Sequence, residues 1–267
     1  MARIEDQRIL VWCNNKVDLQ IAIVDAAYLA IKLEKEVCLF ANFKNAKEEK
    51  ALKLRVGNYA QILKKDIPEL NVSTLMLKGN LHRLMGELGE EYNAILLCCG
   101  QRMSNQLLKA FYRSRFPLFF SKPKPAGGQR FKKLIIPVDF RNNTKEATLW
   151  GSYMGRFNQS EIVLLVANDQ NDNDLQPKVE GVVAFVKTLY NQFLFNFWFD
   201  HGKAGSWGIH KEAMRKADEF DLLIFTGSLY VTLPDYLIGP FEKRIINQCK
   251  TSVLLINPQK EMYVLCS

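Results

Sequence analysis

A few side chains in this sequence carry groups that could contact a ligand. Asp139 follows the apolar run 134–138, and a carboxylate at the carboxyl end of a strand is well placed for ligand binding in a parallel α/β sheet. Its alternative role is local, in a strand-end turn or as support for the amino terminus of the following helix. That helix would begin near Asn142 or Asn143, with Glu146 three residues beyond Asn143 as in a capping arrangement. Both interpretations of Asp139 stay open.

Two histidines raise the question of a metal site. His201 and His210 lie near Asp200, but a separation of nine residues does not place them on one face of a helix, and Gly202 and Gly205 indicate a loop between them. Zinc sites are formed by three or four ligands in close groups, and no other His or Cys cluster joins these residues. We therefore expect no bound metal.

The cysteines offer a third candidate chemistry. Cys98 and Cys99 end an apolar run, so in a strand their side chains would point to opposite faces and one could face a ligand cleft. No neighbour in the sequence would lower the pKa of either thiol. The six cysteines of the chain show no CxxC spacing. We expect buried, reduced thiols.

Composition and charge narrow the class of protein. The chain has 267 residues, 48% hydrophobic and 24% charged, which is typical of globular domains. No apolar run approaches the roughly 18 residues of a membrane span, and Arg3, Glu5 and Asp6 do not fit a signal peptide. We expect a cytoplasmic protein without a membrane partner.

The net charge of +8 suggests an anionic partner. Basic residues are mixed with acids along most of the chain, with a local excess at Lys122, Lys124, Arg130, Lys132 and Lys133. Prolines and glycines are interleaved with that cluster, so a solvated linker explains it. We do not expect nucleic-acid binding, because no recognition motif or aromatic and basic platform is present.

Strand-like and helix-like segments alternate along the whole chain, which predicts βαβ units and parallel sheets. The expected strands are 9–13, 37–41, 72–77, 94–98, 116–120, 134–138, 162–166, 195–199, 222–225 and 252–256. The expected helices are 19–33, 48–63, 81–88, 106–112, 145–157, 179–190, 207–217 and 241–249. Residues 262–265 would form an extra edge strand or an ordered tail.

The order of these segments occurs twice. Residues 91–97 (EYNAILL) match residues 219–225 (EFDLLIF) at an offset of 128, which indicates two copies of one unit. The proline- and glycine-containing segment 121–129 matches neither copy. We therefore predict domains at 1–121 and 131–267 joined by a linker at 122–130. The aromatic stretch 193–199 would lie on two buried faces of a strand or at an interdomain surface.

The second half resembles the universal stress protein family. The segment 132–140 (KKLIIPVDF) is similar to the opening strand of that family, and 221–227 and 251–256 are similar to its fourth and fifth strands. The first half matches mainly through its likeness to the second. The resemblance implies two tandem flavodoxin-like or Rossmann-like sandwiches, of the adenine nucleotide α-hydrolase-like type, each with a five-stranded parallel sheet. It also implies that the two copies pair as a pseudo-dimer.

The resemblance further implies an adenine-nucleotide cleft. In family members that bind ATP, the aspartate after the first strand lies by the adenine, and a Gly-x2-Gly-x9-Gly-Ser/Thr segment after the fourth strand holds the phosphates. Glycines let backbone amides approach an anion, and a helix amino terminus adds favourable charge. The residues of this chain that would line such a cleft are Asp139, Gly227, Ser228 and Gly239, the last of which stands one place before the expected glycine.

The glycine pattern is broken in both copies. Counting from Gly227, Tyr230 and Pro240 replace the next two glycines and Phe241 takes the hydroxyl position, so one amide is missing and a bulky side chain enters. In the first copy Asn14 replaces the aspartate, and Gly100 is followed by Met103 and Arg113 at the positions of the glycines. Starting instead from Cys99 gives Arg102 and Tyr112.

We therefore expect a non-catalytic stress-response or regulatory binding protein with a degenerate ATP loop and an unknown protein partner. Two tandem chains could also associate as a homodimer. The alternatives are a universal stress protein that binds ATP or AMP, and an enzyme of the adenine nucleotide α-hydrolase-like group. The enzymes carry a Ser-Gly-Gly-x-Asp-Ser signature after the first strand, which neither 14–18 nor 139–143 supplies.

Overall fold

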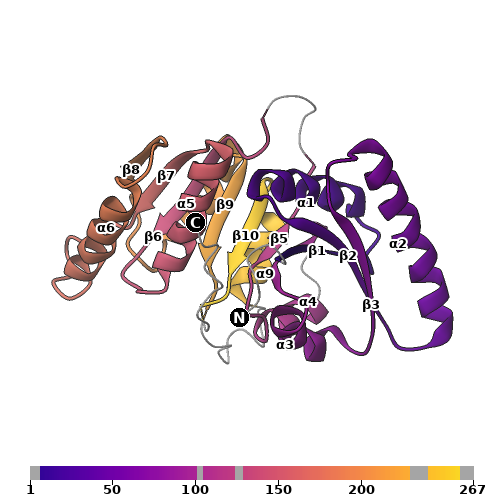
Figure 1. Cartoon of the computed structure of the whole chain (residues 1–267). Helices are drawn as coiled ribbons and strands as arrows, with labels where there is room; N and C mark the ends of the chain where they lie inside the picture. The colour runs from indigo at the N-terminus through magenta and orange to yellow at the C-terminus, as the bar shows by residue number, and fades with distance from the viewer. Residues whose placement is uncertain (1–6, 101–104, 124–128, 229–239, 259–267) are drawn as a thin grey trace. The chain divides into compact units, whose positions relative to one another are not determined.

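The computed structural model describes residues 7–100, 105–123, 129–228 and 240–258 (Figure 1). Contacts divide the chain into two compact units, and the first unit is separated from the second after Pro123. This division lies within the segment predicted as the linker.

The first unit contains five parallel strands connected by helices. Its elements are β1 (Arg8–Trp12), α1 (Leu19–Leu33), β2 (Glu36–Phe43), α2 (Ala46–Asp66), β3 (Val72–Lys78), α3 (Leu81–Glu90), β4 (Ala94–Cys99), α4 (Asn105–Phe111) and β5 (Leu118–Phe120). The strand order is β3-β2-β1-β4-β5. The order reverses between β1 and β4, which is where ligands bind in sheets of this kind.

The second unit repeats this arrangement. Its elements are β6 (Lys133–Val138), α5 (Thr144–Asn158), β7 (Glu161–Val166), α6 (Gln176–Tyr190), β8 (Phe197–His201), α7 (Ile209–Lys216), a 3₁₀ turn (Ala217–Glu219), β9 (Leu222–Thr226), α9 (Phe241–Gln248) and β10 (Ser252–Ile256). The parallel order is β10-β9-β6-β7-β8. Its switch point lies between β6 and β9.

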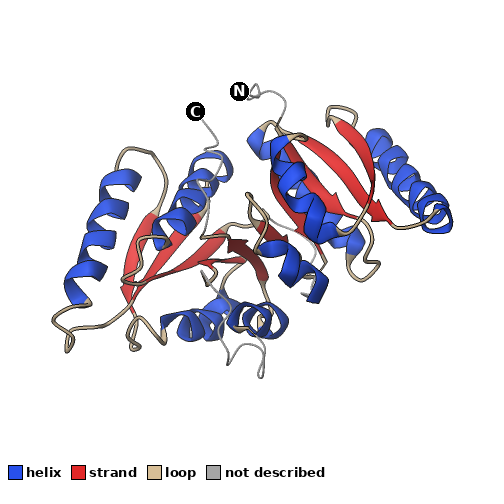
Figure 2. Cartoon of the chain, turned by 90° about the horizontal axis from the view of Figure 1, so that it is seen from below, coloured by secondary structure: helices blue, strands red, loops and turns tan. Residues whose placement is uncertain are grey.

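The predicted α/β class and the five parallel strands in each copy are confirmed. Within each unit, helices cover both faces of the sheet (Figure 2). Every residue of the central strands β4 and β9 is buried, whereas the edge strands β3 and β8 are partly exposed. This difference explains why the inner strands consist almost entirely of apolar residues.

Some element boundaries and the exposure of one lysine differ from the sequence predictions. The strand expected at 195–199 is observed as β8, which begins at Phe197. Lys122, predicted to be solvated, is only 1% exposed. The segment 262–265 lies outside the described residues.

The aromatic stretch before and within β8 packs inside the second unit. The ring of Tyr190 contacts those of Phe195 and Phe197 edge-on, at centroid distances of 5.1 and 5.2 Å. The buried Tyr190 hydroxyl donates a hydrogen bond of 2.7 Å to the carbonyl of Thr148 in α5. For these side chains, packing within one domain therefore replaces the interdomain interpretation.

None of the helices in the described ranges combines the length and the apolar character needed to cross a membrane.

Two glycines test how closely α5 and α6 are packed. A Cβ added at Gly151 would overlap the Tyr190 hydroxyl and Ile136, whereas nothing lies within 4 Å of a Cβ added at Gly181. We expect Gly151→Ala to lower the free energy of unfolding by about 1–3 kcal/mol, because it overpacks the core. Gly181→Ala should raise it by up to about 1 kcal/mol, since alanine favours a helix. Denaturant titration of both variants measures the free energies of unfolding. Equal changes in the two variants would contradict the close packing at Gly151.

Candidate site at the carboxyl edge of the second unit

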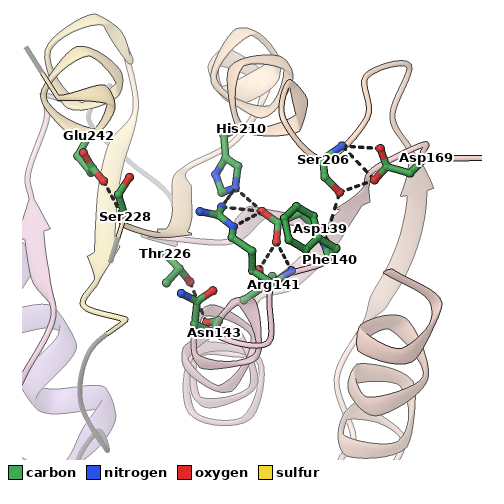
Figure 3. A network of polar contacts seen from close by, with 11 residues as sticks. Asp139, Phe140, Arg141, Asn143, Asp169, Ser206, His210, Thr226, Ser228 and Glu242 are labelled. Carbon is green, nitrogen blue, oxygen red and sulfur yellow. Dashed lines mark hydrogen bonds and ion pairs between the residues drawn. The ribbon is translucent and has the colours of Figure 1, made fainter. Parts of the chain in front are cut away.

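The switch point of the second unit brings together two loops that are far apart in sequence. Because β6 and β9 are parallel neighbours, the residues that follow each strand emerge at the same edge of the sheet. The Thr226 hydroxyl at the end of β9 donates a hydrogen bond of 3.1 Å to the Asn143 carbonyl in the loop after β6. Asp139 and Ser228, both predicted from sequence, lie on these two loops (Figure 3).

Asp139 is completely buried, and side chains of its own unit surround its carboxylate. Its Oδ1 accepts hydrogen bonds from the Arg141 backbone amide at 2.9 Å and the Thr144 hydroxyl at 2.7 Å. Its Oδ2 accepts from Arg141 Nε at 2.8 Å and Arg141 Nη2 at 2.6 Å, and lies 2.9 Å from His210 Nε2. Four donors from Arg141 and Thr144, together with the His210 ring, therefore surround the carboxylate.

The predicted capping arrangement before α5 is wrong. The Asn143 side chain makes no capping hydrogen bond, and its buried Oδ1 has no partner within the described residues. Asp139 instead forms a turn with the Arg141 amide, as aspartates do after strands. It also binds the hydroxyl of Thr144, the first residue of α5. The helix start is therefore held by Asp139.

Helix α7 supplies the second basic group of this cluster. His210 is 5% exposed, and its ring contacts those of Phe225 and Phe241 edge-on, each at 6.0 Å. The Nε2 atom lies 2.9 Å from Asp139 Oδ2 and 2.6 Å from Arg141 Nη2. In the tautomer with the proton on Nε2 it donates to the carboxylate, and in the other tautomer it accepts from the guanidinium. The buried Nδ1 has no hydrogen-bond partner in the described part of the chain.

The cluster shifts the pKa values of both partners. Burial alone would raise the pKa of Asp139, but the hydrogen bonds from His210 and Arg141 and the charge of Arg141 hold it well below its ordinary value. Burial lowers the pKa of His210, and the charge of Arg141 acts in the same direction against the opposing effect of Asp139. At neutral pH the structure therefore contains an Arg141–Asp139 ion pair beside a neutral imidazole.

The backbone amide after β9 is occupied as well. The Ser228 amide donates to the Oε1 atom of Glu242, a residue in the first turn of α9 that is only 1% exposed. The Gly227 amide donates to the Ile256 carbonyl at 2.9 Å. A carboxylate thus takes the place that an anion would have at this helix amino terminus. Gly239 lies outside the described residues.

The residues considered for metal binding have other neighbours. Asp200 accepts a hydrogen bond of 2.8 Å from Lys216 Nζ, His201 is exposed on the edge strand β8, and His210 binds Asp139. Throughout the described ranges, no group of three or more His, Cys, Asp or Glu side chains could hold a metal ion.

The consecutive cysteines of β4 are buried on both faces of the sheet. Cys98 is 0% and Cys99 is 1% exposed, and burial raises the pKa of both thiols well above the ordinary value. Neither side chain forms a thiolate near neutral pH, so neither is the reactive thiol that was considered from the sequence.

In the first unit, amide groups occupy the corresponding edge. Asn14, which stands where the second unit has Asp139, donates to the Asn42 carbonyl at 2.6 Å and accepts from the Asn42 amide at 2.9 Å. The loop after β1 lies against the end of β4, since a Cβ added at Gly100 would overlap the Val17 carbonyl oxygen. The first unit thus fills its own switch point with backbone.

Sequence reasoning did not identify several residues at or near Asp139, among them Thr144. Arg141 follows it by two positions, a spacing that was visible in the sequence but has no meaning without the turn. Ser206 lies on the loop after β8, and its hydroxyl accepts from the Phe140 amide at 3.4 Å. Trp207 is 83% exposed and contacts the Phe140 ring edge-on at 5.4 Å.

The depressed pKa of His210 predicts a pH-dependent stability. In the unfolded chain this histidine binds a proton below about pH 6.5, whereas in the folded chain it stays neutral to lower pH. The free energy of unfolding should therefore fall as pH drops from 7.5 to 5.5, by at most about 1.4 kcal/mol per pH unit from this group. Denaturant titrations at several pH values measure the slope.

Two variants identify the group responsible. His210→Gln keeps a donor for Asp139 but cannot titrate, so its stability should depend less on pH than that of the unchanged protein. His201→Gln removes an exposed histidine and should leave the slope unchanged. Identical slopes in all three proteins would show that His210 does not stay neutral in the folded state.

The fold is similar to several solved structures. A universal stress protein from Archaeoglobus fulgidus DSM 4304 matches with a TM-score of 0.65 and 10% identity, covering 95% of this chain and 99% of that chain. A putative universal stress protein from Pseudomonas aeruginosa UCBPP-PA14 matches with a TM-score of 0.61 and 14% identity, covering 96% and 94%. The cytoplasmic domain of a prokaryotic cation chloride cotransporter matches with a TM-score of 0.55 and 11% identity, covering 97% and 98%.

No family model and no curated protein sequence matches the chain. At these low identities, the structural matches establish the fold and leave the activity open. Two of the three are universal stress proteins by their descriptions, and they match over almost the whole chain. The chain therefore has the fold of a tandem universal stress protein.

Proposed function

We propose that this chain is a universal stress protein-like binding or regulatory protein without catalytic activity, and that it does not use the ordinary ATP position of that fold. The observation that carries the proposal is the internal pairing of the groups that would contact a nucleotide at the switch point of the second unit. The fold supports the family, and the contacts of Asp139 and Ser228 support the loss of the nucleotide.

The carboxylate that would contact adenine already has hydrogen-bond partners within the protein. A base can bind Asp139 only if a carboxylate oxygen can accept from it. Both oxygens already accept from Arg141, Thr144 or His210. Displacing Arg141 would leave a buried carboxylate with fewer partners, and breaking one side of a buried ion pair costs about 3–5 kcal/mol. Adenine contact alone would not offset that cost.

The backbone amide that would contact a phosphate also has a partner within the protein. The Ser228 amide, which would face a phosphate, donates to Glu242, and a second negative group beside that carboxylate would be repelled. Pro240 has no amide hydrogen and precedes α9 directly. These contacts agree with the broken glycine pattern of the sequence.

The exposed side chains near this edge favour a protein partner. Trp207 extends into solvent beside Phe140, and the Arg141 side chain is 30% exposed although it is paired with Asp139. Tryptophan and arginine are the residues most enriched among energetically dominant contacts of protein interfaces. We therefore place the binding surface of the second unit at Trp207, Phe140 and Arg141.

Isothermal titration calorimetry with ATP and GTP tests the proposal. A cleft of the ordinary kind would recognise adenine, so ATP would bind with a micromolar Kd and GTP would bind much more weakly. We expect no such preference, because Asp139 and the Ser228 amide are already paired. AMP, which lacks the two outer phosphates, should give no measurable heat at micromolar concentrations.

Micromolar binding of ATP at least tenfold tighter than of GTP would contradict the proposal and favour an ATP-binding member of the family. Release of ADP or AMP from ATP at a rate that scales with protein concentration would favour the enzyme. Trp207→Ala serves as the matched control, since it alters the edge of the site without touching Asp139 and should leave any adenine preference unchanged.

A further inference from the structure

The first unit contains a basic pocket that the switch point does not include. It has a volume of about 550 Å³ and lies along α3 and the segment that follows α4. Its lining includes His82, Arg83, Gly86 and Glu90 from α3, and Arg113 and Arg115 after α4. A volume of roughly 300–1,000 Å³ is typical of sites for small molecules.

The three guanidinium groups of the pocket are in different states. Arg115 forms an ion pair with Glu90. The side chains of Arg83 and Arg113 form no hydrogen bond or ion pair with any described residue. The pocket therefore holds two unpaired positive charges, with a third guanidinium held in place by a carboxylate at one end.

An imidazole extends the polar lining. The Nδ1 atom of His82 lies 2.8 Å from the Lys109 carbonyl oxygen, to which it donates because a carbonyl can only accept. This contact between α3 and α4 fixes the orientation of the ring.

Gly86 lines the pocket without a side chain. No atom lies within 4 Å of a Cβ built at this position. Crowding by neighbouring atoms therefore does not require a glycine here. A glycine inside a helix costs about 1 kcal/mol relative to alanine. The absence of a side chain at Gly86 therefore leaves open space at the wall of the pocket.

We propose that this pocket binds a small anion with two linked phosphate groups, either inorganic pyrophosphate or the diphosphate portion of a larger metabolite. The planar fork of arginine forms two parallel hydrogen bonds to a phosphate. Two unpaired forks therefore match two phosphates, and a single carboxylate would leave one fork unused.

The ligand selectivity expected of this pocket differs from that of a nucleotide cleft at the switch point. The lining also contains the ring of Tyr112, and stacking on an aromatic ring tolerates any base. ATP and GTP should therefore bind with similar affinity through their phosphates, and pyrophosphate should bind through the same arginines. The site belongs to the first unit and does not involve Asp139. It can therefore be correct or incorrect independently of the proposal for the second unit.

Calorimetric titration of the full chain with pyrophosphate at low salt tests the site. We expect binding by the unchanged protein and at least tenfold weaker binding by Gly86→Glu, which fills the space and adds a negative charge. Gly57→Glu is the matched control. Gly57 lies in α2 of the same unit and also has no atom within 4 Å of an added Cβ, so this variant changes net charge equally and should bind as before.

Arg83→Gln and Arg113→Gln provide a second test that does not depend on the glutamate variant being folded. Each should weaken pyrophosphate binding about tenfold, and the affinity should fall with added salt. The proposal is wrong if the unchanged protein does not bind pyrophosphate, or if Gly57→Glu weakens binding as much as Gly86→Glu. It is also wrong if an acidic peptide binds the pocket and pyrophosphate does not.

The two proposals fail in different ways. If ATP and GTP bind equally and Gly86→Glu abolishes this binding, the result supports anion binding at the pocket. It does not contradict the proposal for the second unit. Binding selective for ATP that persists in Gly86→Glu contradicts the proposal for the second unit, and pyrophosphate then decides on the pocket by itself.

Discussion

A carboxylate buried at the end of an apolar strand must be paired, and this requirement organises the carboxyl edge of the second unit. Asp139 has no exposed surface, and its partners come from the loop after β6, from α5 and from α7. An unpaired charge at this depth would cost several kcal/mol. The same contacts that satisfy the charge also position Arg141 and leave no free acceptor for a base.

The two units have different residue types at the same place in the fold, the carboxyl end of the first strand. The second unit keeps a charge at the end of its first strand and neutralises it with Arg141. The first unit has Asn14 there, and its amide pairs with the backbone of Asn42 without any buried charge. Neutral amides satisfied by backbone are less costly to bury than ions.

Most of the fold could be predicted because it depends on local pattern. The central strands are apolar runs, the helices have amphipathic spacing, and the repeat at 91–97 and 219–225 fixes their order. The ends of β8 were predicted less accurately, because Phe195 packs on Tyr190 before the strand begins. The site was predicted in part. Asp139 was found from its place after a strand, but the pairing of His210 with it joins residues 71 positions apart.

The sequence by itself determined the class, the duplication and the loss of the glycine pattern, because each depends on the identity and spacing of neighbouring residues. Only the tertiary structure decided how charges are paired. It showed that Arg141 neutralises Asp139 and that Glu242 takes the Ser228 amide. It also placed Arg83 and Arg113 together at one pocket. The physical reason is that the energy of a charge depends on burial and on partners brought close by folding, neither of which is local in sequence.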